Sequence, residues 1–482
     1  MKYKILVNKE NRIKENFLKR INLVEIKDYQ NKTILIEEQT KNAYLELQEF
    51  LKTKNIYIGI DSVYRSEEYQ QEIYEYYKEK YGLEYADKIV APIGTSEHHT
   101  GLAIDINLIV NGKVIEENNE LLKYDDIYQE IHKYLKDFGF ILRYPKGKEE
   151  ITKYPYEPWH IRYIGKIPSK IIYENNWTLE EYLSEFNGIV VVNKGKDMTS
   201  FDVVNEVSKT FGIKKVGHTG TLDPLAEGVL IVAIGKATKI VELLTAEDKE
   251  YIAEVKLGIK TDTLDITGEV LEEKEVLEIK NIKQTLNTFK KTYLQQVPIY
   301  SAVKVNGKKL YEYARNNQEV TLPKKEVTIK EIELLEETKD TFKFKTLVTK
   351  GCYIRSLIED ICTELNTIGT MTSLIRTKQG KVTLEDSITL NDLKEGKYKI
   401  KSIEESLNYE IIEVNEYLMK KITSGHKLNN TWNITDKVIF KYNNKLLGIY
   451  EVNENNTLKV WKNFNINWQS FHSENNKRKK NS

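Results

Sequence analysis

The first 186 residues show the hydrophobic patterns of both strands and helices. Alternating apolar and polar residues predict strands at 101–107 and 159–164, and a short apolar run predicts another at 5–7. Helical spacing of apolar residues predicts helices at 43–51, 66–82, 126–138 and 179–183. In the second of these helices, Ser66 is suited to be the cap, and Tyr69, Ile73 and Tyr77 are predicted to face the core.

A new pattern begins at Gly188. Residues 188–193 are typical of a buried strand, and Thr199 or Ser200 is suited to cap the helix that follows. Further strands are predicted at 229–234 and 251–257. Near the end of the chain, short strands at 438–442, 446–452 and 458–460 predict a small β-barrel.

These patterns predict an α+β multidomain protein. The expected parts are a mixed α+β domain at 1–186, a mixed α/β domain at 187–395, a small β-barrel at 396–468 and a charged, disordered tail at 469–482. No linker rich in Pro, Gly or Ser separates the first two parts, so the boundary near Asn187 rests on the change of pattern.

Composition and charge limit the cellular compartment and the kinds of partner that we expect for this protein. The chain has 482 residues, with 73 basic and 73 acidic side chains that cancel, so any contact with nucleic acid must use a local patch. Two cysteines, Cys352 and Cys362, form no disulfide framework and favour a reducing compartment. The N-terminus has no secretory apolar run, and no stretch is long enough to span a bilayer. We therefore expect a cytoplasmic protein without a membrane partner.

The histidines suggest a metal site. His98 precedes a predicted strand that contains Asp105, and His160 starts a later strand, three residues after Glu157. Two imidazoles and one carboxylate would leave zinc an open position for water, with Glu157 free to act as general base. From spacing alone, two ordinary buried histidines and a loop-end acid are an equally good interpretation.

Four stretches in this region resemble the VanY-like family of zinc D-alanyl-D-alanine (or L,D-) carboxypeptidases, over residues 3 to about 183. They are Ser62–Ser66, Ser96–Asp105, Phe138–Pro145 and Glu157–Gly165. The resemblance implies zinc bound by His98, Asp105 and His160, Glu157 as general base and Arg65 facing the scissile carbonyl oxygen. It also implies a muropeptide stem as substrate. His99 stands where the family more often has Gln, and the lack of a signal peptide favours trimming of recycled or precursor muropeptides.

A second candidate site is a carboxylate without a metal. Asp223 lies in the loop 218–228 between two predicted strands, where Pro224 stiffens the chain beside it. Lys350–Arg355 is predicted to be a strand that ends in Arg355, which could pair with Asp223 and keep it ionised and aimed. On their own, Asp223 would more simply cap a turn, Arg355 would be a surface arginine and Cys352 a small core residue.

The motifs around Asp223 closely resemble those of the bacterial tRNA pseudouridine synthase B (TruB) family, over residues 187 to about 390. They are Gly217–Leu230, Lys249–Tyr251, Pro298–Lys304, Tyr311–Arg315 and Gly351–Arg355. The resemblance implies isomerisation of uridine-55 in the tRNA T-loop, without a cofactor. It places the nucleophile at Asp223, its arginine partner at Arg355, the base-stacking aromatic residue at Tyr251 and a nucleotide-holding histidine at His218.

Several features extend or limit this second resemblance. Residues 193–200 depart from the family's opening turn, with Gly195 in place of proline and Asp197 in place of glycine. The predicted barrel resembles the family's PUA-like RNA-binding domain more weakly. Candidate RNA contacts, which are as easily ordinary solvated lysines, are Lys249, Lys304, Lys308, Lys309, Lys324 and Lys325.

Three functions are compatible with these motifs. The first is a two-enzyme fusion, expected to be a monomer, that joins a zinc peptidase to a tRNA pseudouridine synthase. The second keeps the synthase and treats the first domain as a non-catalytic zinc-binding or RNA-positioning module, or as an accidental fusion. The third is an RNA-binding chaperone without catalysis. Glu157 argues against a purely structural zinc site, and the set Asp223, Tyr251 and Arg355 argues against the chaperone.

Overall fold

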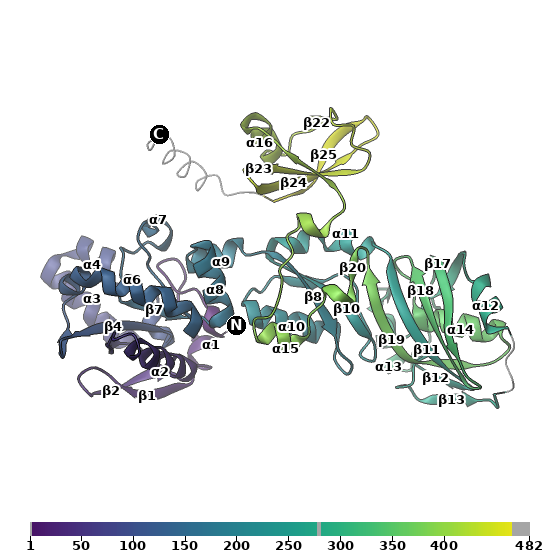
Figure 1. Ribbon diagram of the computed structural model, residues 1–482, viewed down its shortest axis with the longest axis horizontal. Helices are drawn as coiled ribbons and strands as arrows, with labels where there is room; N and C mark the ends of the chain where they lie inside the picture. The colour runs from purple at the N-terminus through teal and green to yellow at the C-terminus, as the bar shows by residue number, and fades with distance from the viewer. Residues whose placement is uncertain (1, 277–280, 465–482) are drawn as a thin grey trace. The chain divides into compact units, whose positions relative to one another are not determined.

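The computed structural model describes residues 2–276 and 281–464, so the predicted tail at 469–482 lies outside the described residues. The chain divides into two compact units, residues 1–186 with 206–214 and residues 187–205 with 215–482. Each unit has its own sheet and core (Figure 1). Among the described residues, no helix combines the length and the apolarity that a bilayer crossing requires.

The first unit is a mixed α+β domain built on an antiparallel sheet of order β3-β4-β7-β6, with β5 paired to β4 and a separate hairpin β1–β2. The bounds of its elements are α1 (Glu15–Leu18), β1 (Leu23–Lys27), β2 (Thr33–Glu37), α2 (Glu38–Lys52), β3 (Ile58–Ser62), α3 (Glu67–Tyr81), α4 (Leu83–Ile89), η2 (Glu97–Thr100), β4 (Ala103–Val110), β5 (Lys113–Ile115), α5 (Asn118–Leu121), α6 (Asp125–Tyr134), η4 (Leu135–Phe138), β6 (Phe140–Leu142), α7 (Glu149–Thr152), β7 (His160–Tyr163), α8 (Lys166–Asn175) and α9 (Leu179–Glu185). Its core combines the inner faces of β3, β4 and β7 with α2 and α6.

Most predicted elements of this unit are confirmed, with two corrections. Ser66 caps α3 by accepting from the amide of Tyr69, and Gly82 ends the helix at φ 90°. Tyr69, however, is 54% exposed, and Gln70 is the buried residue of this helix, so the prediction for Tyr69 was wrong, whereas Ile73 and Tyr77 are half-buried. Residues 5–7 form no strand, and the hairpin β1–β2 (residues 23–37) was not predicted.

The second unit is built on a nine-stranded sheet of order β14-β17-β18-β11-β19-β10-β8, to which β20 and β9 add at β19 and β10. The bounds of its elements are β8 (Gly188–Lys194), α10 (Ser200–Phe211), β9 (Val216–His218), β10 (Glu227–Ile234), α11 (Val241–Ala246), β11 (Lys249–Leu257), β12 (Ile259–Thr261), β13 (Val270–Glu273), α12 (Ile282–Thr288), β14 (Thr292–Gln296), β15 (Lys304–Val305), β16 (Lys308–Lys309), α13 (Leu310–Arg315), β17 (Lys324–Glu337), β18 (Thr341–Val348), α14 (Ile354–Glu364), β19 (Gly369–Gln379), β20 (Val382–Thr383) and α15 (Leu390–Lys394). The strands β10 and β19 run parallel and bring the Asp223 loop beside the centre of the sheet.

A smaller five-stranded sheet follows in the same unit, in the order β21-β23-β24-β25-β22. Its elements are β21 (Glu410–Glu413), α16 (Glu416–Thr423), β22 (Leu428–Asn429), β23 (Lys437–Tyr442), β24 (Lys445–Val452) and β25 (Thr457–Asn463). The sheet is curled, and its edge strands β21 and β22 do not pair with each other (Figure 1). The predicted closed barrel is therefore an open, half-barrel sheet with its own apolar core.

Candidate functional site

Three predicted metal ligands meet at one end of the sheet of the first unit. His98 comes from η2, Asp105 from β4 and His160 from the start of β7, which pairs with β4 so that Asp105 and His160 lie opposite each other. One oxygen of Asp105 is 3.1 Å from His98 Nε2, and the other is 3.0 Å from His160 Nδ1. The ligand atoms of all three residues lie within 4.8 Å of one another. Asp105 Oδ1 is buried without a hydrogen-bond partner, so this donor set fits a zinc ion.

Hydrogen bonds, burial and nearby charges set the orientation of His98 and the pKa values of both histidines. His98 Nδ1 donates to the Val63 carbonyl at 2.6 Å, which leaves the Nε2 lone pair for a metal. Burial, with the nearby Arg65, lowers the pKa of His98 to about 4, so the ring is neutral at pH 7. Burial alone would lower the pKa of His160, but Asp105 raises it to about 9. A metal ion must therefore displace a proton to bind His160.

Glu157 and Arg65 border the same ligands. Glu157 is 3.7 Å from His160 Nδ1, and burial raises its pKa to about 7, in the range of a general base. Arg65 donates to Asp105 at 3.2 Å and to the Ser62 hydroxyl at 3.0 Å. These residues share a cavity of about 530 Å³ with the three ligands, and its wall also includes the rings of Tyr77, Tyr81 and Tyr85 from α3 and α4.

The structure also reveals supporting residues of this site that the sequence analysis missed. His99 donates from Nδ1 to the Arg65 carbonyl and accepts from the Gly94 amide, which ties the arginine's loop to η2. Glu97, Arg143 and Arg162 have fully buried side chains and pair beneath the ligands. Burial alone would raise the pKa of Glu97, but the two arginines hold it well below its usual range. Glu97, Arg143 and Arg162 all lie within the stretches quoted for the family resemblance, and for the two arginines the available signal was a charged residue among apolar neighbours.

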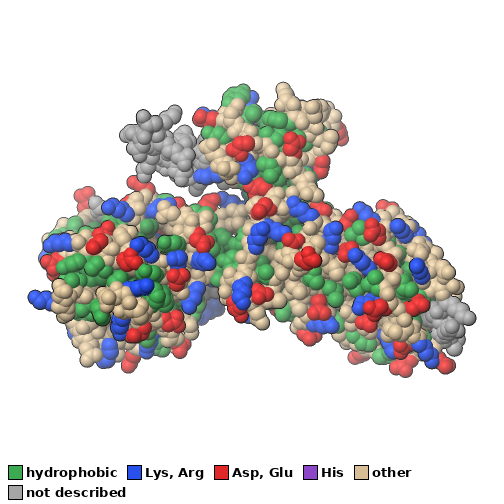
Figure 2. Space-filling view, in the orientation of Figure 1, with side chains coloured by type: hydrophobic (Ala, Val, Ile, Leu, Met, Phe, Trp, Pro, Cys, Tyr) green, Lys and Arg blue, Asp and Glu red, His purple; other side chains and the backbone are tan. Residues whose placement is uncertain are grey.

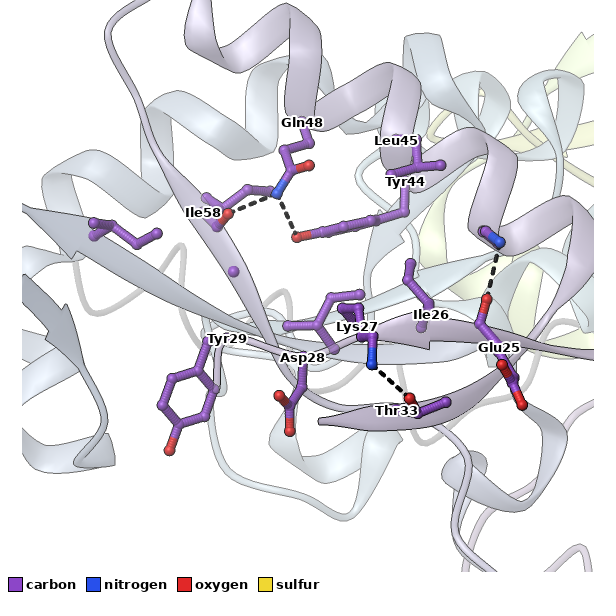
Figure 3. A pocket seen from close by; sticks show the side chains of 14 residues that line it. Glu25, Ile26, Lys27, Asp28, Tyr29, Thr33, Tyr44, Leu45, Gln48 and Ile58 are labelled. Atoms are coloured by element: carbon purple, nitrogen blue, oxygen red, sulfur yellow. Dashed lines mark hydrogen bonds between the residues drawn. The ribbon is translucent and has the colours of Figure 1, made fainter. Parts of the chain in front are cut away.

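A second hollow in this unit contains none of the predicted site residues (Figure 3). It measures about 560 Å³ and lies among β1, β2, α2 and β3. Gln48 donates to the Ile58 carbonyl at 2.9 Å and to the Tyr44 hydroxyl at 3.3 Å, while Lys27 donates to Thr33 (Figure 3). Since these polar groups already bond to one another, this hollow shows no cluster that points to a ligand.

The Asp223 loop of the second unit is held on both sides. On one side, Ser200 at the start of α10 accepts from the Leu222 amide at 2.8 Å and donates to its carbonyl at 3.1 Å. On the other side, the buried Lys194 donates to the carbonyls of Pro224 and Ala226. These bonds fix the backbone around Asp223, whose side chain remains 34% exposed.

Arg355 meets Asp223, as predicted, but from a different element. The segment before it is not a strand: β18 ends at Val348, and Arg355 lies in the first turn of α14. From there its guanidinium reaches Asp223 Oδ2 at 3.0 Å and also donates to the carbonyls of Thr263 and Tyr300. A buried fork with three fixed acceptors holds the carboxylate in one direction. Cys352 in the same segment is half-buried, and burial raises the pKa of its thiol to about 12, which disfavours the thiolate.

Tyr251 is joined to the same loop by a residue that the sequence analysis missed, Arg376 of β19. Arg376 is buried and donates to the Tyr251 hydroxyl at 3.2 Å and to the carbonyls of Gly220, Thr221 and Val229. Its guanidinium also lies 5.5 Å from the centre of the Tyr251 ring. One arginine thus fixes both the predicted stacking residue and the loop that carries Asp223.

The predicted RNA contacts include two residues with internal hydrogen bonds, His218 and Lys249, and three lysines of one hairpin. His218 stands at the end of β9, half-buried, and accepts from the Gly220 amide. Lys249 is buried, and its ammonium donates to the carbonyls of Thr245 and Glu247, so it braces the loop before β11 and is not displayed on the surface. Lys304, Lys308 and Lys309 lie in the hairpin β15–β16, with Lys308 and Lys309 beside the rings of Tyr313 and Tyr311.

Charge on the surface agrees with the balanced composition. On the face drawn in Figure 2, Lys and Arg side chains are interspersed with Asp and Glu. That face carries no large region of a single sign.

Two groups of known proteins match the chain, one for each site. Residues 208–354 match the TruB family pseudouridylate synthase (N terminal domain), and residues 33–166 match the D-alanyl-D-alanine carboxypeptidase VanY. Among relatives, tRNA pseudouridine synthase B of Caldanaerobacter subterraneus subsp. tengcongensis is 41% identical over 54% of this chain and 92% of the relative. The same enzyme of Fusobacterium nucleatum subsp. nucleatum is 41% identical over 57% of this chain and 99% of the relative.

Among solved structures, the vancomycin-resistance D,D-pentapeptidase VanY of a VanB-type cassette, in complex with Zn(II), is 31% identical over 38% of this chain and 99% of that chain, with a TM-score of 0.32. The sequence matches and the paired Asp223 and Arg355 define the second unit as a pseudouridine synthase. The chain belongs to the tRNA pseudouridine synthase B family. It joins this synthase to a VanY-like carboxypeptidase domain.

Proposed function

We propose that the second unit converts uridine-55 of the tRNA T-loop to pseudouridine, with Asp223 as the nucleophile. The observation that carries this proposal is the 3.0 Å pair of Asp223 with the buried Arg355, beside a loop that Arg376 links to Tyr251. A partly exposed carboxylate with a fixed direction can approach a base that has left its stack.

The chemistry requires little beyond these side chains. Asp223 attacks either C1′ of the ribose or the base, the bond from C1′ to N1 breaks, and the uracil turns. A bond then forms from C1′ to C5, the bond to Asp223 breaks, the proton on C5 leaves, and N1 takes up a proton, so that the product is an isomer of the substrate. Tyr251 is positioned to stack on the target base, and no hydride, phosphate or metal takes part in these steps.

A substitution of the proposed nucleophile tests this assignment. In the full chain, D223N should abolish pseudouridine formation in a T-loop transcript while the transcript still binds. The matched control is D248N, which removes a carboxylate that is as exposed as Asp223 and pairs with Lys330 at 2.6 Å, and it should keep normal turnover. Turnover by D223N within tenfold of the wild type would disprove the nucleophile assignment.

RNA binding is proposed to involve two further parts of the chain. The cations Lys304, Lys308 and Lys309 stand on a hairpin beside tyrosine rings, a combination suited to a phosphate backbone and unstacked bases. The curled five-stranded sheet, predicted at 396–468, would act as a PUA-like RNA-binding domain after the catalytic domain at 187–395. Because a tRNA is the substrate, we place the protein in the cytoplasm and expect it to act as a monomer.

For residues 1–186 we propose a zinc carboxypeptidase that removes the last D-alanine from a muropeptide stem. His98, Asp105 and His160 would hold the ion, since their donor atoms converge within 4.8 Å. Bound zinc would supply a Lewis acid that makes a water molecule acidic near neutral pH. Glu157 would take the proton of that water, and Arg65 would stabilise negative charge on the scissile carbonyl oxygen.

Mass spectrometry of zinc-loaded protein with tetrapeptide and pentapeptide stems tests this second activity. Loss of one D-alanine supports the peptidase, and the stem that shortens distinguishes L,D- from D,D-specificity. E157Q should stop the cleavage and keep the zinc, whereas E150Q, an exposed residue of α7, should change neither. If neither stem shortens, the alternative is favoured, in which the domain is a non-catalytic zinc-binding or RNA-positioning module or an accidental fusion.

A further inference from the structure

Two buried polar atoms face each other beneath the candidate metal ligands. Glu97 Oε2 and His160 Nε2 are both buried without a hydrogen-bond partner, and they lie 3.7 Å apart. The Glu97 side chain has no exposed surface, and that of His160 is 5% exposed. Since buried polar groups are almost always hydrogen-bonded, two unsatisfied atoms in one place call for a physical explanation.

The orientation of Glu97 is fixed by its other oxygen. Oε1 accepts from Arg143 Nε at 2.8 Å and from Arg162 Nη1 at 2.7 Å. Arg143 is held in turn by a two-pronged pair with Glu180, and Arg162 donates to the carbonyls of Tyr3 and Ile5. If Glu97 served only to neutralise the two arginines, its second oxygen would have no function. Both arginines instead use one oxygen and leave Oε2 directed at His160.

The Nε2 atom of His160 needs a hydrogen-bond acceptor when the ring binds a metal through Nδ1. Its Nδ1 is 3.0 Å from Asp105 Oδ1 and therefore belongs to the metal side of the ring. A neutral imidazole carries one proton, so a ring that ligates a metal through Nδ1 must carry its proton on Nε2. The Tyr144 ring packs 4.8 Å from the imidazole and offers Nε2 no polar partner.

We propose that Glu97 is a positioning residue that accepts a hydrogen bond from the Nε2–H group of His160 and thereby presents the Nδ1 lone pair to the metal. The inference rests on the zinc site proposed above. Closing the pair from 3.7 Å to a hydrogen bond of about 3 Å requires only a small rotation of either side chain. Such outer contacts set both the protonated nitrogen and the direction of a ligating histidine.

Zinc affinity, measured by competition with a chromophoric chelator in the full chain, tests the proposal. E97L should bind zinc about 10- to 100-fold more weakly than the wild type, the usual effect of losing such a contact. E97Q should also lose affinity, because its one carbonyl oxygen accepts from the two arginines and its amide NH2 group then faces the Nε2–H group of His160. The matched control is E180Q, which disturbs Arg143 from its other side but does not contact His160, and it should bind zinc within twofold of the wild type.

The outcomes separate this inference from the proposed function. If the wild type binds no zinc, the proposed metal site is wrong. If the wild type binds zinc and E97L binds it equally well, only the role of Glu97 is overturned. A loss in E180Q equal to that in E97L would also overturn it, since the ion-pair network alone would then explain the effect.

A measurement on the wild type keeps the inference testable if E97L fails to fold. In histidine-selective ¹⁵N NMR of the zinc-loaded protein, the His160 signals, assigned by their loss in H160Q, should show a protonated Nε2 whose hydrogen exchanges slowly. A ring that is protonated at Nδ1, or an Nε2 that carries no proton, would refute the proposed hydrogen bond.

Discussion

Arg355 offers the sharpest test of how the synthase site works. Its guanidinium contacts Asp223 Oδ2 at 3.0 Å and the carbonyls of Thr263 and Tyr300 at 2.9 Å and 3.1 Å, with 6% of the side chain exposed. R355A removes all three contacts. R355K keeps one positive charge but loses the planar fork that reaches three acceptors at once.

The expected rate loss in R355A follows from the electrostatic interaction between Arg355 and Asp223. If the centres of the two charged groups lie about 4 Å apart, two unit charges interact by about 4 kcal/mol at the effective dielectric constant of about 20 that suits a partly exposed site. Because Asp223 is 34% exposed, water screens part of this interaction, and we take about 2 kcal/mol as the lower bound of the interaction energy. If that interaction aims the nucleophile in the transition state, R355A should lower kcat by roughly 30- to 1,000-fold. R355K should fall between R355A and the wild type.

Single-turnover kinetics separate this loss from weaker binding. With enzyme in excess over a T-loop stem-loop tritiated at C5 of the target uridine, tritium release reports the chemical step directly. The substitution D248N serves again as the control for altered charge. An R355A rate within threefold of the wild type, in a protein that remains folded by circular dichroism, would refute the view that the arginine aims Asp223.

Two further predictions concern the stability of the same site. Gly228 has φ 105°, and a Cβ there would lie 2.2 Å from the Arg376 carbonyl oxygen, so G228A should destabilise the second unit by about 3 kcal/mol in urea denaturation. G307A, at φ 81° with open space around it, should cost only about 1 kcal/mol, and equal losses would contradict the steric argument. Burial lowers the pKa of Lys194 and of Lys249 to about 8. Because these lysines titrate near pH 10.4 in the unfolded chain, that state binds more protons between about pH 8 and pH 10, and the free energy of unfolding should rise with pH across this window. Hydrogen exchange of β10 amides, corrected for intrinsic rates, should show rising protection from pH 8 to 9.5 in the wild type and a smaller rise in K249M, and falling protection in the wild type would contradict the lowered pKa values.

The sequence by itself determined which residue types stand at which points of each site. His98, Asp105 and His160 were predicted as ligands because the stretches that contain them resemble the VanY-like family, since their spacing alone left ordinary buried residues as an equally good interpretation. Asp223 was predicted as the nucleophile because the motifs around it resemble the TruB family, since the loop alone would more simply suggest a turn cap. The local pattern of apolar residues was strong enough to predict α2, α6, β4, β7, β10 and β11, since β11 alternates buried and half-buried residues and β10 is a continuous buried run.

Only the tertiary structure decided the contacts between residues that are distant in sequence. Arg355 was predicted on a strand, yet its reach to Asp223 depends on the first turn of α14, because a short apolar run does not distinguish a strand from a buried helix. Glu97, Arg143 and Arg162, like Arg376 and Lys249, have charged side chains whose burial no local pattern predicts. A charged group enters a core only when partners from other elements satisfy it, and those partners are brought together by the fold alone.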